Sequence, residues 1–276
     1  MSKTDDGPIG VMMREMTMWV DFAALLADPV FYGIHVPRGN GKLVVLIPGF
    51  MGNDLYLMPM LNWLGRIGYT PVRSSLNLSA GCMHRSCEEV KAQIGRQLKR
   101  KQRQVALIGH SRGGAIAWAL ASQMQEQVSH LVLLGAGLPG FQRSVESGTH
   151  NLRLGGLTRM LLHANRFSRR MLDPNCLFPS CECPFSNHAE RPLSPATALI
   201  SLYGSDDLVI PEGAKMVDGE IIHIRTAHVG LVYHPEVYRI LGRFFATERD
   251  TCRTAGGLTS RVNLTSCSRA SYSPSR

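Results

Sequence analysis

The stretch Val105–Gly114, VALIGHSRGG, decides the fold and the chemistry that we predict for this chain. It opens with an apolar run typical of a buried strand, continues with GHSRG (109–113), and leads into a small-residue run typical of a helix. A serine at a sharp strand-to-helix turn has a strained backbone, and a Cβ two residues before or after it would crowd that turn. This context favours a nucleophile elbow with Ser111 as nucleophile over a Gly-rich loop with an incidental serine.

Apolar runs on both sides of this motif predict further strands, at 42–47, 68–72, 130–134, 198–203 and 221–225. Helices are predicted between them, at 57–67, 86–101, 114–121 and 235–245. Alternating strands and helices with short loops predict an α/β fold, with a mostly parallel central sheet and helices on both faces. Ligands of such sheets bind at the carboxyl ends of the strands, where every candidate residue below lies.

The 276 residues predict one domain with additions at its ends and in its middle. Residues 1–41 should form an amphipathic helix (Met12–Asp28) that packs on the domain, or lines a substrate entrance, and a lead-in. Residues 42–246 should form the α/β domain, and 247–276, rich in Ser, Thr and Arg, a disordered tail. Residues 141–195 interrupt the alternation and should form an insertion with a helix at Leu152–Phe167.

Composition narrows the class of partner. The net charge is +9, but the basic runs close a helix or lie in the insertion and tail, without interleaved aromatic residues. We therefore expect no nucleic-acid partner. The N-terminus lacks the pattern of a secretory signal, and no apolar run is long enough to cross a bilayer. Seven cysteines, an odd number, favour a reducing cytoplasm and mostly free thiols.

A serine hydroxyl needs a base within hydrogen-bond reach, and that base needs a third group to hold it. For a serine on such a turn, the acid and then the histidine are expected downstream. Two acids follow the strand at 198–203, Asp206 and Asp207. Spacing from Gly204 and to Pro211 favours Asp207, whereas Asp206 could cap the turn.

The histidine that we expect to act as base is His228. It directly follows the strand at 221–225 and precedes Gly230, so a loop can present its ring. A surface histidine is the alternative interpretation. His234 lies beside Pro235 at a helix start, where capping or packing is expected, and His223 falls within the strand.

A tetrahedral intermediate needs two backbone N–H donors for its oxyanion. The residue after the nucleophile, Arg112, should supply one through its main chain. The other should come from the loop PGFMG (48–52) after the first strand, from Phe50 or, as the second choice, Met51. A simple turn from strand to helix would also explain the proline and glycines of this loop.

Together these motifs resemble the α/β-hydrolase superfamily, and more narrowly its small bacterial lipase- and esterase-type members. The resemblance covers about 42–245, interrupted by the insertion, and rests on PGFMGND (48–54), GHSRGG (109–114), GSDDLVIP (204–211) and HVGLVYHPEVYRIL (228–241). It implies the α/β-hydrolase fold, a Ser-His-Asp triad and a lid or cap formed by 141–195. Pro48 departs from the pattern, because many relatives carry histidine before the glycine.

The predicted reaction is hydrolysis of a carboxylic ester through an acyl-enzyme, without cofactor or metal. Several apolar residues near the strand ends suggest an acyl pocket: Met51, Leu55, Leu57, Leu138 and Phe141. Such a pocket would favour a small-molecule ester or a lipid-like ester as substrate. Core packing explains some of these residues equally well. The same triad serves acyl transfer and the hydrolysis of thioesters and amides. A non-catalytic ligand-binding protein of this fold is the other alternative.

Several cysteines remain outside this chemistry. In the insertion, Cys176, Cys181 and Cys183 precede His188, and free thiols are expected there, with a structural zinc or a disulfide as alternatives. Cys82 and Cys87 flank a helix start and would pair only in an oxidising compartment.

Overall fold

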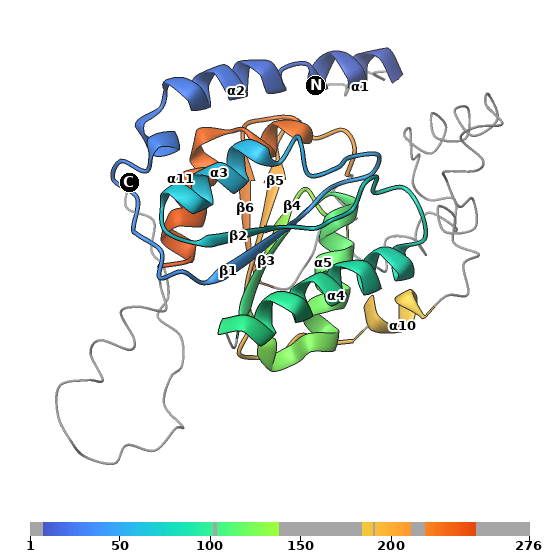
Figure 1. Cartoon of the computed structure of the whole chain (residues 1–276). Helices are drawn as coiled ribbons and strands as arrows, with labels where there is room; N and C mark the ends of the chain where they lie inside the picture. The colour runs from blue at the N-terminus through green and yellow to red at the C-terminus, as the bar shows by residue number, and fades with distance from the viewer. Residues whose placement is uncertain (1–7, 102–103, 138–183, 190, 211–218, 247–276) are drawn as a thin grey trace.

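The computed structural model describes residues 8–101, 104–137, 184–189, 191–210 and 219–246. At its centre lies a six-stranded sheet in the order β2-β1-β3-β4-β5-β6, in which every neighbouring pair is parallel (Figure 1). The strands are β1 (Leu43–Ile47), β2 (Thr70–Arg73), β3 (Val105–His110), β4 (Val128–Leu134), β5 (Ala198–Gly204) and β6 (Glu220–Ile224). The predicted parallel sheet is therefore confirmed.

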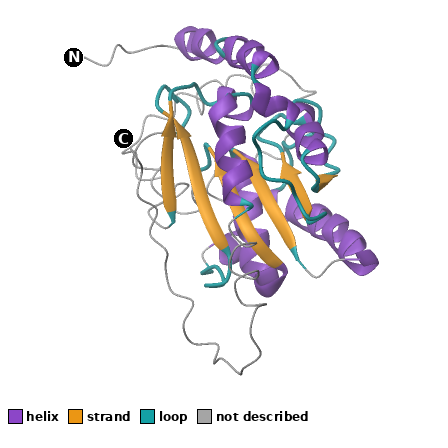
Figure 2. Ribbon diagram, turned by 90° about the vertical axis from the view of Figure 1, so that its left-hand side faces the viewer, coloured by secondary structure: helices purple, strands orange, loops and turns teal. Residues whose placement is uncertain are grey.

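Helices cover both faces of this sheet (Figure 2). They are α3 (Met58–Arg66), α4 (Met83–Lys101), α5 (Arg112–Met124) and α11 (Pro235–Phe244), with short 3₁₀ turns η1 (Pro29–Tyr32), η2 (Gln125–Gln127) and η4 (Val229–Val232). The order of strands and helices is the predicted one, and α4 begins three residues before the predicted start at 86. The fold is thus the α/β architecture that the hydrophobic runs predict.

The sheet separates two apolar clusters because successive strand residues point to opposite faces. Val44 and Leu46 contribute to the cluster under α3 and α11, whereas Leu43, Val45 and Ile47 contribute to the cluster under α4 and α5. Both faces are buried, so every residue of β1 must be apolar. Removing one such side chain from water stabilises the fold by about 1.5–3 kcal/mol.

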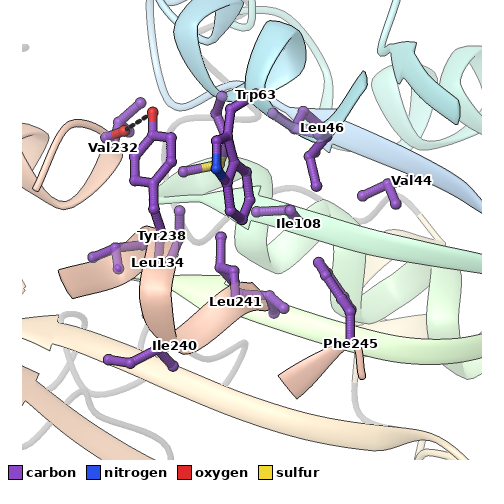
Figure 3. Close-up of a cluster of buried hydrophobic side chains, with 14 of the residues drawn as sticks. Val44, Leu46, Trp63, Ile108, Leu134, Val232, Tyr238, Ile240, Leu241 and Phe245 are labelled. Carbon is purple, nitrogen blue, oxygen red and sulfur yellow. Dashed lines mark hydrogen bonds between the residues drawn. The ribbon is translucent and has the colours of Figure 1, made fainter. Parts of the chain in front are cut away.

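Large aromatic side chains fill the first of these clusters (Figure 3). Trp63 of α3 and Tyr238 of α11 are fully buried, with ring centroids 4.9 Å apart in an edge-to-face arrangement. Their polar atoms still find partners, because Trp63 Nε1 donates to the Val30 carbonyl at 2.9 Å and the Tyr238 hydroxyl to the Val232 carbonyl at 3.0 Å. Burying these rings therefore leaves no donor unsatisfied.

The order of the strands also fixes where a ligand can bind. The chain passes from β1 outward to β2 and then returns to place β3 on the other side of β1. The carboxyl ends of β1 and β3 therefore flank the switch point of the sheet, where α/β folds bind their ligands. The loops that leave these two strands carry Phe50 and Ser111.

The N-terminal segment differs from the single helix predicted over Met12–Asp28. The structure has two helices, α1 (Pro8–Glu15) and α2 (Met18–Ala27), separated by a turn. The Thr17 hydroxyl donates to the Arg14 carbonyl at 2.7 Å and the Thr17 N–H to the same oxygen at 3.0 Å, which offers the backbone an alternative to helical bonding. The single-helix prediction is therefore wrong; α2 packs against η1, η4 and α11.

The described end of the insertion lies away from the carboxyl ends of the strands. Helix α10 (Phe185–Ala189) packs against α4 and α5, and Phe185 belongs to the buried cluster on that face (Figure 1). The Ser122 hydroxyl donates to the His188 carbonyl at 2.6 Å, about 16 Å along α5 from Ser111. Residues 185–189 of the predicted insertion thus pack on the face of the domain that α4 and α5 cover, and the predicted bounds of the cap, 141–195, stay a prediction.

The rest of the predicted insertion, including its helix at 152–167, and the tail from 247 lie outside the described residues. Within the described ranges, no helix is both long and apolar enough to span a membrane. Cys82 and Cys87 are both free thiols, and burial raises the pKa of the Cys87 thiol to about 12.

Candidate active site

The predicted site residues come from loops that leave one edge of the sheet. Ser111 directly follows β3, Phe50 lies three residues after β1, and Asp207 three residues after β5. His228 lies four residues after β6 and immediately before η4. Since all strands are parallel, these four loops meet at the carboxyl edge.

Ser111 occupies the strained turn that its sequence context predicts. Its φ of 52° and ψ of −123° lie in a region that L-residues rarely adopt, and it precedes the first residue of α5. A Cβ on Gly109 would lie 2.5 Å from the Gly114 Cα, and one on Gly113 would lie 2.7 Å from the Pro48 carbonyl oxygen. The glycines therefore let strand, turn and helix pack directly on one another.

Asp207 and His228 are in direct contact. His228 Nδ1 lies 2.7 Å from Asp207 Oδ2, and both side chains are buried. The other carboxylate oxygen, Oδ1, accepts N–H bonds from Val209 at 2.7 Å and from Ile210 at 3.0 Å. Burial alone would raise the pKa of Asp207, but these bonds and the nearby His228 hold it below the usual value of 3.8. Asp206 is exposed and makes no such contact with the histidine among the described residues.

The second nitrogen of His228 has a different environment. Nε2 is buried and has no hydrogen-bond partner within the described part of the chain, so no Ser111 Oγ–Nε2 bond is formed. The His228 ring packs against the backbone after β4, where a Cβ on Gly135 would lie 2.9 Å from Nδ1. The structure thus joins acid and histidine directly, and leaves Nε2 able to accept a proton from another group.

The loop after β1 lies beside the serine. A Cβ on Gly49 would lie 3.1 Å from the Ser111 Cβ, which places the next residue, Phe50, next to the elbow. The Met51 N–H donates to the Ser79 carbonyl at 3.1 Å, whereas the Phe50 N–H has no acceptor among the described residues. Of the two predicted donors, Phe50 is therefore the one that can receive a new acceptor.

His110 connects this loop with the histidine loop, although no pattern in the sequence predicts a role for it. Gly49 N–H donates to the Tyr56 hydroxyl at 2.6 Å, and that oxygen lies 3.0 Å from His110 Nδ1. His110 Nε2 lies 3.2 Å from the His228 carbonyl oxygen. Since the carbonyl oxygen can only accept, Nε2 carries the proton donated to it, and Nδ1 of the neutral ring then accepts from the Tyr56 hydroxyl.

Burial keeps this connecting histidine neutral. His110 is fully enclosed, and desolvation together with the nearby His228 lowers its pKa from 6.5 to about 3. The centroids of the two imidazole rings are 5.0 Å apart. The chain Gly49–Tyr56–His110–His228 thus joins the loops after β1, β3 and β6 by hydrogen bonds of fixed direction.

Two further charged side chains hold neighbouring loops. The Arg112 guanidinium donates to the Gly81 carbonyl, and Asp54 Oδ1 accepts from the Ser74 hydroxyl at 2.7 Å and from the Ser74 N–H at 3.1 Å. Both contacts tie the segment after β2 to the loops that surround Ser111. Arg112 therefore has a structural side chain in addition to the main-chain role predicted for it.

The predicted pocket residues divide into three groups. Met51 and Leu55 are exposed, at 51% and 70% of their surface, in the loop after β1. Leu57 is buried in the core under α3, so core packing, the alternative stated for some of these residues, explains it. Leu138 and Phe141 lie outside the described residues.

Other candidates fall where their surroundings explain them. His234 caps α11, since its Nδ1 accepts from the Glu236 N–H at 3.2 Å, and His223 is exposed on β6. No group of three potential metal ligands occurs among the described residues, which exclude Cys176, Cys181 and Cys183. Tyr56 and Glu15 also lie close to the site without any local sequence pattern that marks them.

Comparisons with known proteins agree with this fold. Residues 60–157 match the family model described as alpha/beta hydrolase fold, and a comparison with curated proteins found no match. Among solved structures, one reported with carboxylesterases of Nitrososphaera gargenis shares 18% identity at a TM-score of 0.52, covering 78% of this chain and 93% of that chain. One of the metagenome-derived lipolytic enzymes LipS and LipT shares 15% identity at 0.50, covering 78% and 96%. Mouse alpha/beta hydrolase domain-containing protein 10 shares 14% identity at 0.50, covering 79% and 92%.

Proposed function

This chain has the α/β-hydrolase fold, and we propose that it hydrolyses carboxylic esters through a triad of Ser111, His228 and Asp207. The observation that carries the proposal is the buried 2.7 Å contact between Asp207 and His228. It lies at the same edge of the sheet as Ser111, which has a positive φ. An acid, an imidazole and a serine at one edge supply the three groups of nucleophilic catalysis.

The proposed reaction begins with attack of Ser111 Oγ on the acyl carbon of the ester. His228 Nε2 takes the serine proton as the bond forms, and later gives it to the leaving alcohol. A water molecule activated by the same nitrogen then releases the acid from the acyl-enzyme. The lack of a competing hydrogen bond on Nε2 among the described residues supports this role.

Asp207 would keep His228 in the tautomer that this sequence of steps needs. With Nδ1–H donated to Asp207 Oδ2, the lone pair of the ring is on Nε2. The N–H bonds from Val209 and Ile210 hold the carboxylate in place, so the imidazolium formed during attack has a fixed negative partner.

Two backbone N–H groups would bind the oxyanion, those of Phe50 and Arg112. Support comes from the Phe50 N–H, which has no acceptor among the described residues, and from the position of Arg112 at the start of α5. At this end of a helix the helix dipole favours negative charge.

The exposed side chains of Met51 and Leu55 beside this loop favour an apolar acyl or alcohol group in the substrate. Structures of the same fold that are titled as carboxylesterases and lipolytic enzymes are consistent with that class of substrate.

The test is labelling by a fluorophosphonate together with turnover of p-nitrophenyl esters of graded chain length. We expect the wild type to label and to hydrolyse esters with an apolar acyl chain, and Ser111→Ala to do neither, losing about 10⁴-fold or more in kcat. Ser205→Ala, which removes an exposed hydroxyl just after β5, is the matched control and should behave as wild type. A wild type that neither labels nor turns over any ester would overturn the proposal.

A further inference from the structure

Glu15, the last residue of α1, contacts the backbone of the histidine loop. Its Oε1 accepts the N–H of His228 at 3.2 Å, and its Oε2 accepts the N–H of Val229 at 2.7 Å. One carboxylate thus binds two consecutive N–H groups at the start of η4, through residues 213 and 214 positions apart in the sequence.

These two N–H groups need an acceptor from outside their own segment. They belong to His228, the residue before η4, and to Val229, its first residue, whose N–H groups have no partner inside the turn. The His228 side chain makes no capping bond either. A carboxylate that accepts from backbone N–H groups forms charge-assisted bonds, which are stronger than neutral ones. Glu15 therefore fixes the backbone from which the His228 ring extends.

A second carboxylate of the N-terminal helices binds the same loop. Asp21 Oδ2 accepts from the Thr226 hydroxyl at 2.5 Å, and a Cβ on Gly230 would lie 2.5 Å from that same oxygen. The ring of Phe22 also packs edge-to-face on Tyr233, with centroids 5.3 Å apart. The loop is thus held by α1 and α2 both before and after His228 (Figure 1).

The charges of the candidate site act on the carboxyl group of Glu15. Burial raises its pKa above the usual 4.5, and the Asp207 charge adds to this, whereas the Val229 and His228 N–H groups and the His228 ring lower it. Glu15 is half-buried, and its carboxylate binds the backbone of the His228 loop.

We propose that Glu15 is a positioning residue for the reaction: its carboxylate holds the His228 loop so that the imidazole keeps its bond to Asp207 and leaves Nε2 to take the serine proton. The inference rests on the proposed function, because it assigns Glu15 a part in the same site. Both hydrogen bonds of Glu15 to this loop are to main-chain N–H groups, so it acts through His228.

The test compares Glu15→Gln with Glu89→Gln, the same change of charge at an exposed position of α4. Glutamine keeps the size of the side chain but offers only one acceptor oxygen, and its NH₂ group opposes the second N–H. With kcat normalised to the fluorophosphonate-reactive serine, we expect Glu15→Gln to lower kcat by about 10- to 100-fold, with KM within about twofold. Glu89→Gln should match wild type, and equal kcat values in the two variants would overturn the proposal.

A purely structural role would lower the melting temperature of Glu15→Gln without changing kcat per active serine. The NMR signal of the His228 Nδ1 proton gives a further readout, which should broaden or shift in Glu15→Gln and stay unchanged in Glu89→Gln.

Amide exchange separates failure of this proposal from failure of the proposed function, and it needs no turnover. The His228 and Val229 amides should be protected in the wild type and exchange at least about tenfold faster in Glu15→Gln than in Glu89→Gln. If the wild type turns over no ester, the proposed function fails while this measurement still tests the contact. If Glu15→Gln does not fold, the exchange rates of the two amides in the wild type decide. Exchange of the His228 and Val229 amides as fast as that of unprotected amides would overturn the proposal.

Discussion

The turn that carries Ser111 and the loop that carries His228 are held in place by different kinds of contact. Glycines within two residues of Ser111 fix the turn, through close approach of backbone to backbone. His228 is fixed by groups distant in sequence, with Asp207 21 positions away and Glu15 213 positions away. The difference teaches that a short stretch of sequence can specify a nucleophile, whereas the geometry of its base depends on the assembled fold.

The largest effect should come from breaking the contact on which the His228 loop depends most. Asp207→Asn keeps the shape of the side chain, but its amide can donate to Nδ1 and so favours the wrong tautomer of His228. We expect kcat to fall by about 10⁴-fold, as in other triads, with little change in KM. Steady-state kinetics with p-nitrophenyl esters measure the loss.

The matched control is the neighbouring acid. Asp206→Asn alters an exposed side chain that does not contact the histidine, so kcat should stay within about twofold of the wild type. A reversed pair of results would assign the third position of the triad to Asp206.

A smaller effect, on stability, should come from breaking the local contacts of the Ser111 turn. A Cβ on Gly113 would lie 2.7 Å from the Ile47 carbonyl carbon and from the Pro48 oxygen, both of them backbone atoms that cannot rotate away. Gly113→Ala should therefore lower the free energy of unfolding by about 3 kcal/mol, measured by urea denaturation.

The control for this substitution is another helical glycine. A Cβ on Gly95 of α4 meets no atom within 4 Å, so Gly95→Ala should raise the free energy of unfolding by about 0.5–1 kcal/mol. If both substitutions were neutral, the crowding around the turn would not be what requires glycine there.

The same distinction explains how far the sequence predicts this molecule. The unbroken apolar runs that become β1 and β3 predict strands buried on both faces, because local pattern and final environment agree. Leu57 stayed open between a pocket and the core because the sequence near a strand end does not show whether an apolar side chain faces a ligand or the core. The turn between α1 and α2 was missed because the bonds of Thr17 to Arg14 override a continuous helical periodicity.

For the candidate site, order along the chain points to Ser111, Asp207 and His228, and their catalytic roles stay predictions. The partners of His228 could not be found in the same way. Glu15 and Asp21 are the two acids of α1 and α2, and nothing local shows that the Glu15 carboxylate binds a loop near the other end of the chain. The contact of Glu15 with this loop becomes visible only in the assembled fold, where α2, the helix after Glu15, packs against η4.

The smallest effect tests the histidine that joins the two regions. His110 has a pKa lowered from 6.5 to about 3 by burial, so the folded protein leaves it neutral where the unfolded chain protonates it. Stability from this group is therefore present above pH 6.5 and is lost as the pH falls below that value. Between pH 6.5 and about pH 5 the wild type should lose on the order of 1–2 kcal/mol of its free energy of unfolding through His110 alone.

His110→Gln removes this titrating ring, so the free energy of unfolding of the variant should fall less steeply over the same pH window, by the same amount, on the order of 1–2 kcal/mol. The window lies above the usual aspartate pKa of 3.8, which keeps the contribution of Asp207 nearly constant. His223→Gln, at an exposed position of β6, is the control and should keep the wild-type slope. Equal slopes in all three proteins, measured by urea denaturation at each pH, would mean that His110 takes up a proton in the folded state. The hydrogen-bond chain from Gly49 to His228 would then lack the direction that a neutral His110 gives it, and the two loops would be joined by packing alone.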